Sequence, residues 1–197
     1  MLDLAAFVVD ASVIVRVLVG GPFEDACQAF LDLCVARDAR LLAPTCLYSE
    51  AANARYRLCL AKPPAPVLQV SEATGFVRSL AAFDIALVDR VHRPASGPLA
   101  LTPQWEQLPD GTIRDYCSDI YARAIDLSYP SRRGSLFDMA YAALAEQAGT
   151  TLWTVDERFY NGARAMGLAF VMHPGYAPRR RGPHLSAPRT ISLTEVR

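Results

Sequence analysis

Two short strand-like segments, each ending at an aspartate, constrain the fold of this chain more than any other feature. Residues 150–155 have the composition of a strand and stop at Asp156. Residues 5–9 form a continuously apolar, partly β-branched run that stops at Asp10. Strands that are buried on both faces have this pattern, and parallel sheets are built from such strands. We therefore expect both runs to lie in one parallel sheet.

Segments with helical periodicity alternate with these and further strands. A short helical turn should follow Asp10, and Gly20, Gly21 and Pro22 should end it. We expect additional strands at residues 40–43, 85–88 and 169–172, and helices at residues 23–37, 45–60, 67–83, 113–127, 135–148 and 157–166. Strands that alternate with helices predict an α/β fold, here a three-layer α/β/α sandwich around a central, mostly parallel sheet of four to five strands.

The length of 197 residues suits one compact domain. We expect this domain to cover residues 1–173, with a proline-rich insertion at about residues 92–112. Residues 174–197 contain Arg179, Arg180, Arg181 and several prolines, so we expect an irregular tail there.

The charge composition argues against several classes of protein. Twenty basic and twenty acidic residues cancel, which does not favour a protein that coats nucleic acid by charge alone. Lys62 is the only lysine and lies beside two prolines, so Schiff-base chemistry is disfavoured. The chain also lacks the glycine-rich phosphate-binding motif of P-loop nucleotide hydrolases.

The sequence favours a soluble, cytoplasmic protein. The five cysteines are odd in number and show no CxxC pair, as is usual in a reducing compartment. No basic residue precedes Arg16, whereas a signal peptide begins with positive charge. No stretch approaches the 18 apolar residues of a membrane span, so we expect no membrane association.

Four carboxylates are predicted to gather at one edge of the sheet. Asp10 and Asp156 follow parallel strands, whose carboxyl ends share an edge where ligands bind in such folds. Glu50 lies between apolar residues on the inward face of its predicted helix, and Asp138 lies in the first turn of another. Carboxylates that converge repel one another, and a divalent cation removes this cost. Oxygen ligands alone indicate Mg²⁺ or Mn²⁺.

Each acid also has a simpler structural explanation. Asp10 and Asp156 are placed to cap the helices that follow them, as is Ser12. The segment from Ser135 to Asp138 has the spacing of a capping box. Glu50 is compatible with a solvated helix charge. The coincidence of all four acids at one edge is what favours a metal site.

Four segments of the sequence, in order, resemble the PIN domain and most of all the VapC-type toxins of bacterial type II toxin–antitoxin pairs. They are FVVDAS, APTCLYSEAANA, SLFDMAYAALAEQAG and TLWTVDERF. The resemblance covers roughly residues 5–60 and 113–172. It implies a Mg²⁺-dependent ribonuclease whose catalytic and metal-binding acids are Asp10, Glu50, Asp138 and Asp156. Ser12 and Thr154 match small polar residues that support these acids in the family.

The resemblance implies hydrolysis of RNA phosphodiester bonds, with Asp10 and Asp138 as principal metal ligands. An acidic site repels RNA, so basic side chains must attract the strand. The candidates for this role are Arg132, Arg133, Arg55, Arg57 and the arginines of the tail. A cognate antitoxin and a homodimer are the expected partners.

Two other functions remain open at this stage. A PIN-like fold can serve as a binding module without catalysis, although loss of an acid would be the sign of it and none is lost. Alternatively, Asp10 at the end of a strand suits a phospho-receiver or an aspartyl-phosphate hydrolase. Those families use a lysine near the phosphate, and Lys62 is poorly placed for that role.

Overall fold

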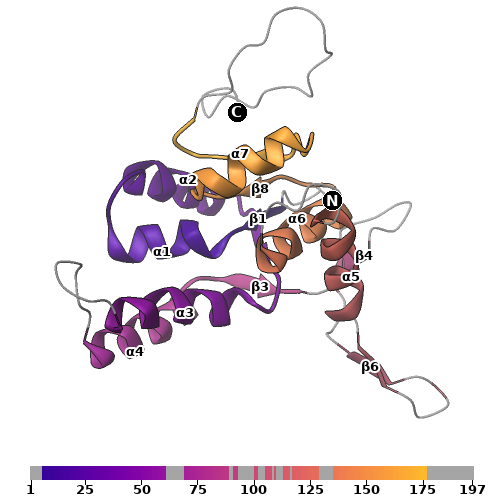
Figure 1. The fold of residues 1–197 in the computed structure, drawn as a ribbon, viewed down its shortest axis with the longest axis horizontal. Coiled ribbons are helices and arrows are strands. Elements are labelled where there is room, and N and C mark those ends of the chain that lie inside the picture. The colour runs from indigo at the N-terminus through magenta and orange to yellow at the C-terminus, as the bar shows by residue number, and fades with distance from the viewer. Residues whose placement is uncertain are drawn as a thin grey trace, which may run out of the picture.

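The computed structural model describes residues 6–60, 69–88, 91–92, 100–101, 105–107, 109, 113–115, 117–128 and 135–176. Its centre is a sheet in the order β3-β2-β1-β8-β9, in which every neighbouring pair is parallel (Figure 1). The strands are β1 (Ala6–Val9), β2 (Arg40–Ala43), β3 (Ile85–Leu87), β8 (Leu152–Trp153) and β9 (Val171–Met172). The predicted parallel sheet is confirmed, and all five of the expected strand segments contribute to it.

Helices alternate with these strands along the chain. They are α1 (Ala11–Val19), α2 (Glu24–Ala36), α3 (Leu47–Cys59), α4 (Val70–Ser79), the 3-10 helix η1 (Leu80–Ala82), α5 (Cys117–Ser128), α6 (Leu136–Ala148) and α7 (Glu157–Ala165). The turn expected after Asp10 is a full nine-residue helix, α1. No helix in the described part of the chain has the length and apolar character needed to cross a membrane.

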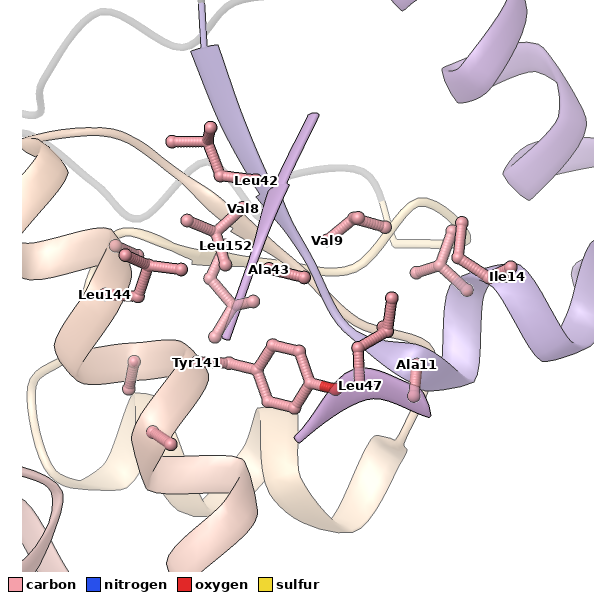
Figure 2. Packing of buried hydrophobic residues seen from close by; sticks show 14 of the residues in the cluster. Val8, Val9, Ala11, Ile14, Leu42, Ala43, Leu47, Tyr141, Leu144 and Leu152 are labelled. Carbon is pink, nitrogen blue, oxygen red and sulfur yellow. The ribbon is translucent and has the colours of Figure 1, made fainter. Parts of the chain in front are cut away.

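Helices cover both faces of the sheet, as the three-layer prediction required. On one face, the Phe30 ring of α2 stacks on Trp153 at 4.4 Å between centroids and meets the edge of Phe7 at 6.0 Å. Val8 and Leu152 are paired in register and alternate with these residues, so they face the opposite side. There they meet Leu144 of α6 (Figure 2). The core is therefore divided into two apolar layers by the sheet.

Helix α6 is buried along most of its length. Its run of small and apolar residues from Met139 to Ala145 is fully buried between the sheet and α5. Ser135 caps its first turn, and Gly149 ends it in the left-handed conformation at φ 60°. Outside the core, Arg123 of α5 donates two hydrogen bonds, at 2.6 and 2.9 Å, to Glu146 of α6. This packing fixes the position of the first turn of α6.

The segment expected to be a long loop contains short antiparallel strands in its described residues. Strand β4 (Val91–His92) pairs with β5 (Ala100–Leu101), and β6 (Trp105–Gln107) pairs with β7 (Ile113–Asp115). The prediction of a helix from residue 113 was therefore wrong at its start, because α5 begins only at Cys117. Residues 113–115 form a strand because they pair with β6. Helical periodicity within one segment gives no information about such a contact. The domain limits at 1–173 and 174–197 remain predictions, since residues 177–197 lie outside the described residues.

The chain after β9 is held by an aromatic cluster. His173 is buried and lies edge-on to Phe23 at 4.8 Å, while the Tyr176 ring stacks on it at 4.2 Å. The Gly175 backbone approaches Phe23 so closely that a Cβ there would lie 2.2 Å from the phenyl ring. Only glycine allows this approach, which ties the end of β9 to the start of α2.

We expect Gly175→Ala to destabilise the fold by about 1–3 kcal/mol, because the added methyl group displaces a packed ring. The measurement is the free energy of unfolding from urea titration. Gly75→Ala is the matched control, since a Cβ at Gly75 in α4 meets nothing within 4 Å. That substitution should stabilise the protein by up to about 1 kcal/mol through helix propensity. Equal effects of the two substitutions would contradict the close-approach argument.

Candidate active site

Asp10 has the most buried of the four predicted carboxyl groups, with 4% of its surface exposed. It directly follows β1 and caps α1, accepting a hydrogen bond from the Ser12 backbone N–H at 3.3 Å. Its Oδ2 also accepts from the Ser12 hydroxyl at 2.6 Å and from the Thr154 hydroxyl. Asp10 therefore caps α1, and its carboxylate can at the same time contribute to a functional site. These bonds fix the orientation of its carboxylate.

The two hydroxyls connect Asp10 to the chain that follows β8. The Ser12 hydroxyl accepts a hydrogen bond from the Val155 backbone N–H at 3.1 Å. The Thr154 hydroxyl accepts one from the Asp156 backbone N–H at the same distance. Ser12 and Thr154 thus lie where the sequence placed them, in contact with Asp10 and next to the second strand-end acid.

Asp138 and Asp156 each cap their own helix with one oxygen. Asp156 Oδ1 accepts from the Phe159 backbone N–H at 2.9 Å. Asp138 Oδ2 accepts from the Ser135 backbone N–H at 2.8 Å, and the Ser135 hydroxyl accepts from Asp138 N–H at 3.1 Å, completing the predicted capping box. The caps use only Oδ1 of Asp156 and Oδ2 of Asp138. The described caps do not use the second oxygen of either carboxylate.

Glu50 lies in the first turn of α3 and points inward. Burial raises its pKa to about 7, and the negative charge of Asp10 adds to the effect. Tyr141 of α6 offsets this in part with its hydroxyl, which lies at the end of the ring directed toward Leu47 and Ala11 in Figure 2. Neither Glu50 Oε2 nor the Tyr141 hydroxyl has a hydrogen-bond partner of standard geometry among the described residues.

The charges of neighbouring acids add to the raised pKa values of Asp10, Glu50 and Asp138. Burial raises the pKa of Asp10 to about 6, with a further contribution from the charge of Asp138. Burial also raises the pKa of Asp138, to which the charge of Asp156 adds. Asp138 and Asp156 act in the same direction on Glu50. The structure therefore brings the four acids to one edge of the sheet, within electrostatic range of one another.

The residues present fit a hard divalent cation. Among the described residues, no three acidic, histidine or cysteine side chains lie close enough to form a ready-made ligand cluster. Nevertheless, Glu50 Oε2 is buried, it has no hydrogen-bond partner of standard geometry among the described residues, and the neighbouring acids repel it. A buried polar atom of this kind costs free energy unless a ligand satisfies it. Carboxylate oxygens are what Mg²⁺ and Mn²⁺ prefer.

The arginines predicted to bind RNA occupy different environments. Arg55 is buried, and its guanidinium carbon lies 4.9 Å above the Phe76 ring of α4. Its position gives no support to the RNA-binding prediction, because it packs α3 against α4. Arg132 and Arg133 lie outside the described residues. Arg57, two residues after Arg55, is exposed and lines a cleft beside the acids.

This cleft has a volume of about 880 Å³ and extends from Asp138 and Asp156 along α7. Arg158, Asn161 and Gly162 line it from α7. We did not predict these residues, or Tyr141, from the sequence. Helical spacing could have indicated them, because residues three or four apart lie on one helix face. Arg158 and Gly162 are four residues apart, and Tyr141 lies three residues after Asp138.

The sequence pattern of the PIN domain family matches residues 7–165, from β1 to the end of α7. The chain belongs to the PIN domain family. The PIN family is a family of nucleases, which generally use a divalent metal. A comparison with curated protein sequences found no match.

Among solved structures, this PIN domain is similar to several distant ones. FitAcB from Neisseria gonorrhoeae is 19% identical, with a TM-score of 0.45 over 85% of this chain and 97% of that chain. VapBC2 from Rickettsia felis, bound to a DNA fragment from its promoter, is 11% identical, with a TM-score of 0.49 over 85% and 98%. PAE2754 from Pyrobaculum aerophilum is 17% identical, with a TM-score of 0.44 over 80% and 79%.

The raised pKa of Glu50 predicts how the stability of the metal-free protein depends on pH. A carboxyl with a higher pKa in the folded state binds protons more tightly there, so stability falls as pH rises from about 4.5 to about 7. We expect Glu50→Gln to reduce this fall and to stabilise the protein in EDTA at pH 8 by about 1–3 kcal/mol. The measurement is urea unfolding at a series of pH values.

Glu146→Gln is the control, for which we expect a loss of stability instead of a gain. The Arg123 guanidinium bonds the Glu146 carboxyl and lowers its pKa, so this exposed pair stabilises the protein once Glu146 is ionised. Removing the Glu146 charge should lower the free energy of unfolding by up to about 1 kcal/mol at pH 8. A loss of stability in Glu50→Gln as well as in Glu146→Gln would show that the Glu50 charge is already compensated.

Proposed function

We propose that this PIN domain is a divalent-metal-dependent ribonuclease and the toxin of a type II toxin–antitoxin pair. One observation carries the catalytic part: the four carboxylates lie near the carboxyl edge of the sheet within electrostatic range of one another, and the pKa of Glu50 stays raised although the Tyr141 hydroxyl offsets the shift in part. A structural role does not explain why a fold would keep this repulsion. A cation held between the acids does.

Asp10, Asp138, Asp156 and Glu50 would hold the metal, directly or through water. Asp138 and Asp156 offer the oxygens that their helix caps leave free. A bound Mg²⁺ or Mn²⁺ supplies a water of lowered pKa and neutralises charge on the scissile phosphate.

The other groups of the site orient these acids and handle the proton. Ser12 and Thr154 hold the Asp10 carboxylate in one orientation, so it needs little rearrangement when a cation binds. With a cation between the acids, the Glu50 carboxylate would be ionised and could accept a hydrogen bond or a proton from a neighbouring water. We assign it the task of orienting or deprotonating the attacking water.

The choice of RNA and the toxin role rest on the resemblance of the four sequence segments to VapC-type toxins. On this basis we propose a cognate antitoxin that covers the acidic site, a homodimer as the resting state and a cytoplasmic location. The proposed nuclease domain is residues 1–173, with the insertion at 92–112 and the tail at 174–197 as additions to it.

The nuclease is tested by incubating the purified protein with a mixed RNA pool, including transfer RNA, in Mg²⁺, Mn²⁺ or EDTA. We expect cleavage with either metal and none in EDTA. Asp10→Asn should lower the rate at least about 100-fold. Asp84→Asn is the matched control, because Asp84 is exposed and precedes β3 at the opposite edge of the sheet, and it should cleave at the normal rate.

Absence of cleavage under any metal, by folded protein without a copurified inhibitor, would contradict the proposal. Labelling with a phosphoryl donor then separates the two alternatives. A label at Asp10 would indicate an aspartyl-phosphate enzyme or receiver, and no label would indicate a binding module.

The toxin role predicts that expression of the wild-type chain alone arrests bacterial growth. Asp10→Asn should abolish the arrest and Asp84→Asn should not, because only Asp10 lies in the acidic site. Growth curves after induction provide the measurement, with immunoblots confirming equal protein levels. Normal growth with active, soluble nuclease in the cells would refute the toxin role and leave the nuclease intact.

A further inference from the structure

The segment that leads from β8 into α7 lies beside an aromatic cluster made of Phe23, Tyr160, His173 and Tyr176. Strand β9 pairs with β8, and a hydrogen bond from the Thr154 backbone N–H to the Met172 carbonyl, at 3.0 Å, extends this pairing. His173 directly follows Met172 and is buried, with 3% of its surface exposed. Its ring is therefore placed next to the chain that follows β8.

His173 is held as a neutral ring in one orientation. Its Nδ1 accepts a hydrogen bond from the Gly175 backbone N–H at 3.1 Å, so the proton of the neutral ring is on Nε2. Burial lowers the pKa of His173, which favours this neutral form. Phe23 and Tyr160 meet the imidazole edge-on at 4.8 and 5.6 Å between centroids, and Tyr176 stacks on it at 4.2 Å. These contacts leave the ring little freedom to turn.

The backbone between Val155 and Asp156 is held from two sides. The Val155 carbonyl lies close enough to His173 to offset part of the lowering of its pKa. Nε2 of His173 is buried and has no partner of standard geometry among the described residues. The Asp156 N–H belongs to the same planar peptide unit as the Val155 carbonyl, and it donates to the Thr154 hydroxyl at 3.1 Å. That hydroxyl donates in turn to Asp10.

The cluster also holds the first turn of α7. The Tyr176 hydroxyl donates a hydrogen bond to Glu157, the first residue of this helix. Tyr160 lies one turn further along, and its backbone N–H donates to the Asp156 carbonyl at 2.8 Å. The residue that caps α7 is therefore fixed by a side-chain bond on one side and by ring packing on the other.

Phe23 contributes its ring from a backbone conformation that is rare for residues other than glycine. Its φ is 68°, in the left-handed region. Phe23 precedes α2 without forming a side-chain cap, so capping does not account for this conformation. Residues are kept in such conformations where the surrounding structure requires them. Here the contacts of the Phe23 ring with His173 and Gly175 supply the requirement.

We propose that His173 is a positioning residue of the acidic site. Its imidazole supports the peptide unit between Val155 and Asp156 opposite the Thr154 hydroxyl, and this fixes the directions of the Asp10 and Asp156 carboxylates. The effect on a metal rests on the proposed function, whereas the effect on the backbone does not. Groups that orient metal ligands in this way change metal affinity by about 10–100-fold.

The effect on the backbone is tested in the metal-free protein by amide hydrogen exchange, followed by NMR at neutral pH. His173→Phe keeps an aromatic ring but has no ring nitrogen. We expect exchange of the Asp156 amide to accelerate at least about tenfold more than exchange of the Leu152 amide, which donates to Phe170 within the sheet. Equal acceleration of both amides indicates a loss of global stability alone and would overturn the proposal, as would unchanged exchange at Asp156.

The effect on the metal is tested by calorimetric titration with Mn²⁺ in the absence of RNA. His173→Phe should weaken Mn²⁺ binding about tenfold, because the ligands are less well oriented. Tyr176→Phe keeps every ring and removes only the bond to Glu157, so we expect a loss of about threefold.

Arg164→Gln is the matched control for both measurements. The exposed Arg164 side chain donates to the Ala169 carbonyl at 2.9 Å near the other end of α7, and its replacement should change neither Mn²⁺ affinity nor exchange at Asp156. If His173→Phe does not fold, Tyr176→Phe decides by the same two measurements.

The outcomes separate this inference from the proposed function. Mn²⁺ binding by the wild type, with normal affinity and normal Asp156 exchange in His173→Phe and Tyr176→Phe, would leave the proposed function standing and overturn the role of His173. A wild type that binds no Mn²⁺ would contradict the proposed metal site. Amide exchange in the metal-free protein would then still decide for or against the positioning of Asp156 by His173.

Discussion

Burial of the Asp10 carboxylate at the end of β1 is the constraint on which the rest of the site depends. A carboxylate with 4% exposure is costly unless its oxygens are satisfied. Hydroxyls from Ser12 and Thr154 supply the bonds, and the same hydroxyls accept backbone N–H groups from the segment after β8. One buried charge therefore connects two strands, the start of α1 and the approach to α7. The position of Asp156 follows from that connection.

Hydrogen bonding satisfies Asp10 only in part, because burial of the charge, and to a lesser degree repulsion from Asp138, still raises its pKa. The pKa values of Asp10 and Glu50 stay raised despite the hydroxyls and Tyr141. A fold selected only for stability would place an amide or an apolar side chain at position 50. The structure keeps a carboxylate there in the first turn of α3, close to the hydroxyl of Tyr141 on the buried helix α6. The free energy lost in the metal-free state is what becomes available to a cation.

Local patterns in the sequence were sufficient to predict the sheet and the placement of the acids. Asp10 and Asp156 follow from strand-like runs. Glu50 follows in part from its helix face, because Leu47 is buried as expected whereas Ala54, the other residue expected on that face, is exposed. Contacts between distant segments were not predictable in this way. Arg55 and Arg57 are two residues apart on α3, yet only the position of Phe76 on α4 decides which of them is buried. Likewise, pairing with β6 makes residues 113–115 a strand.

The spacing between acids and arginines reconciles two opposing requirements. A guanidinium in direct contact with the carboxylates would satisfy them and compete with a cation for the same oxygens. An acidic site without nearby positive charge would repel a phosphate chain before a metal could help to bind it. Arg57 lies two turns along α3 from Glu50, and Arg158 acts on Asp138 without forming an ion pair with a described residue. Under the proposed function, this separation would leave the acids charged for a metal and the two arginines available to a phosphate chain.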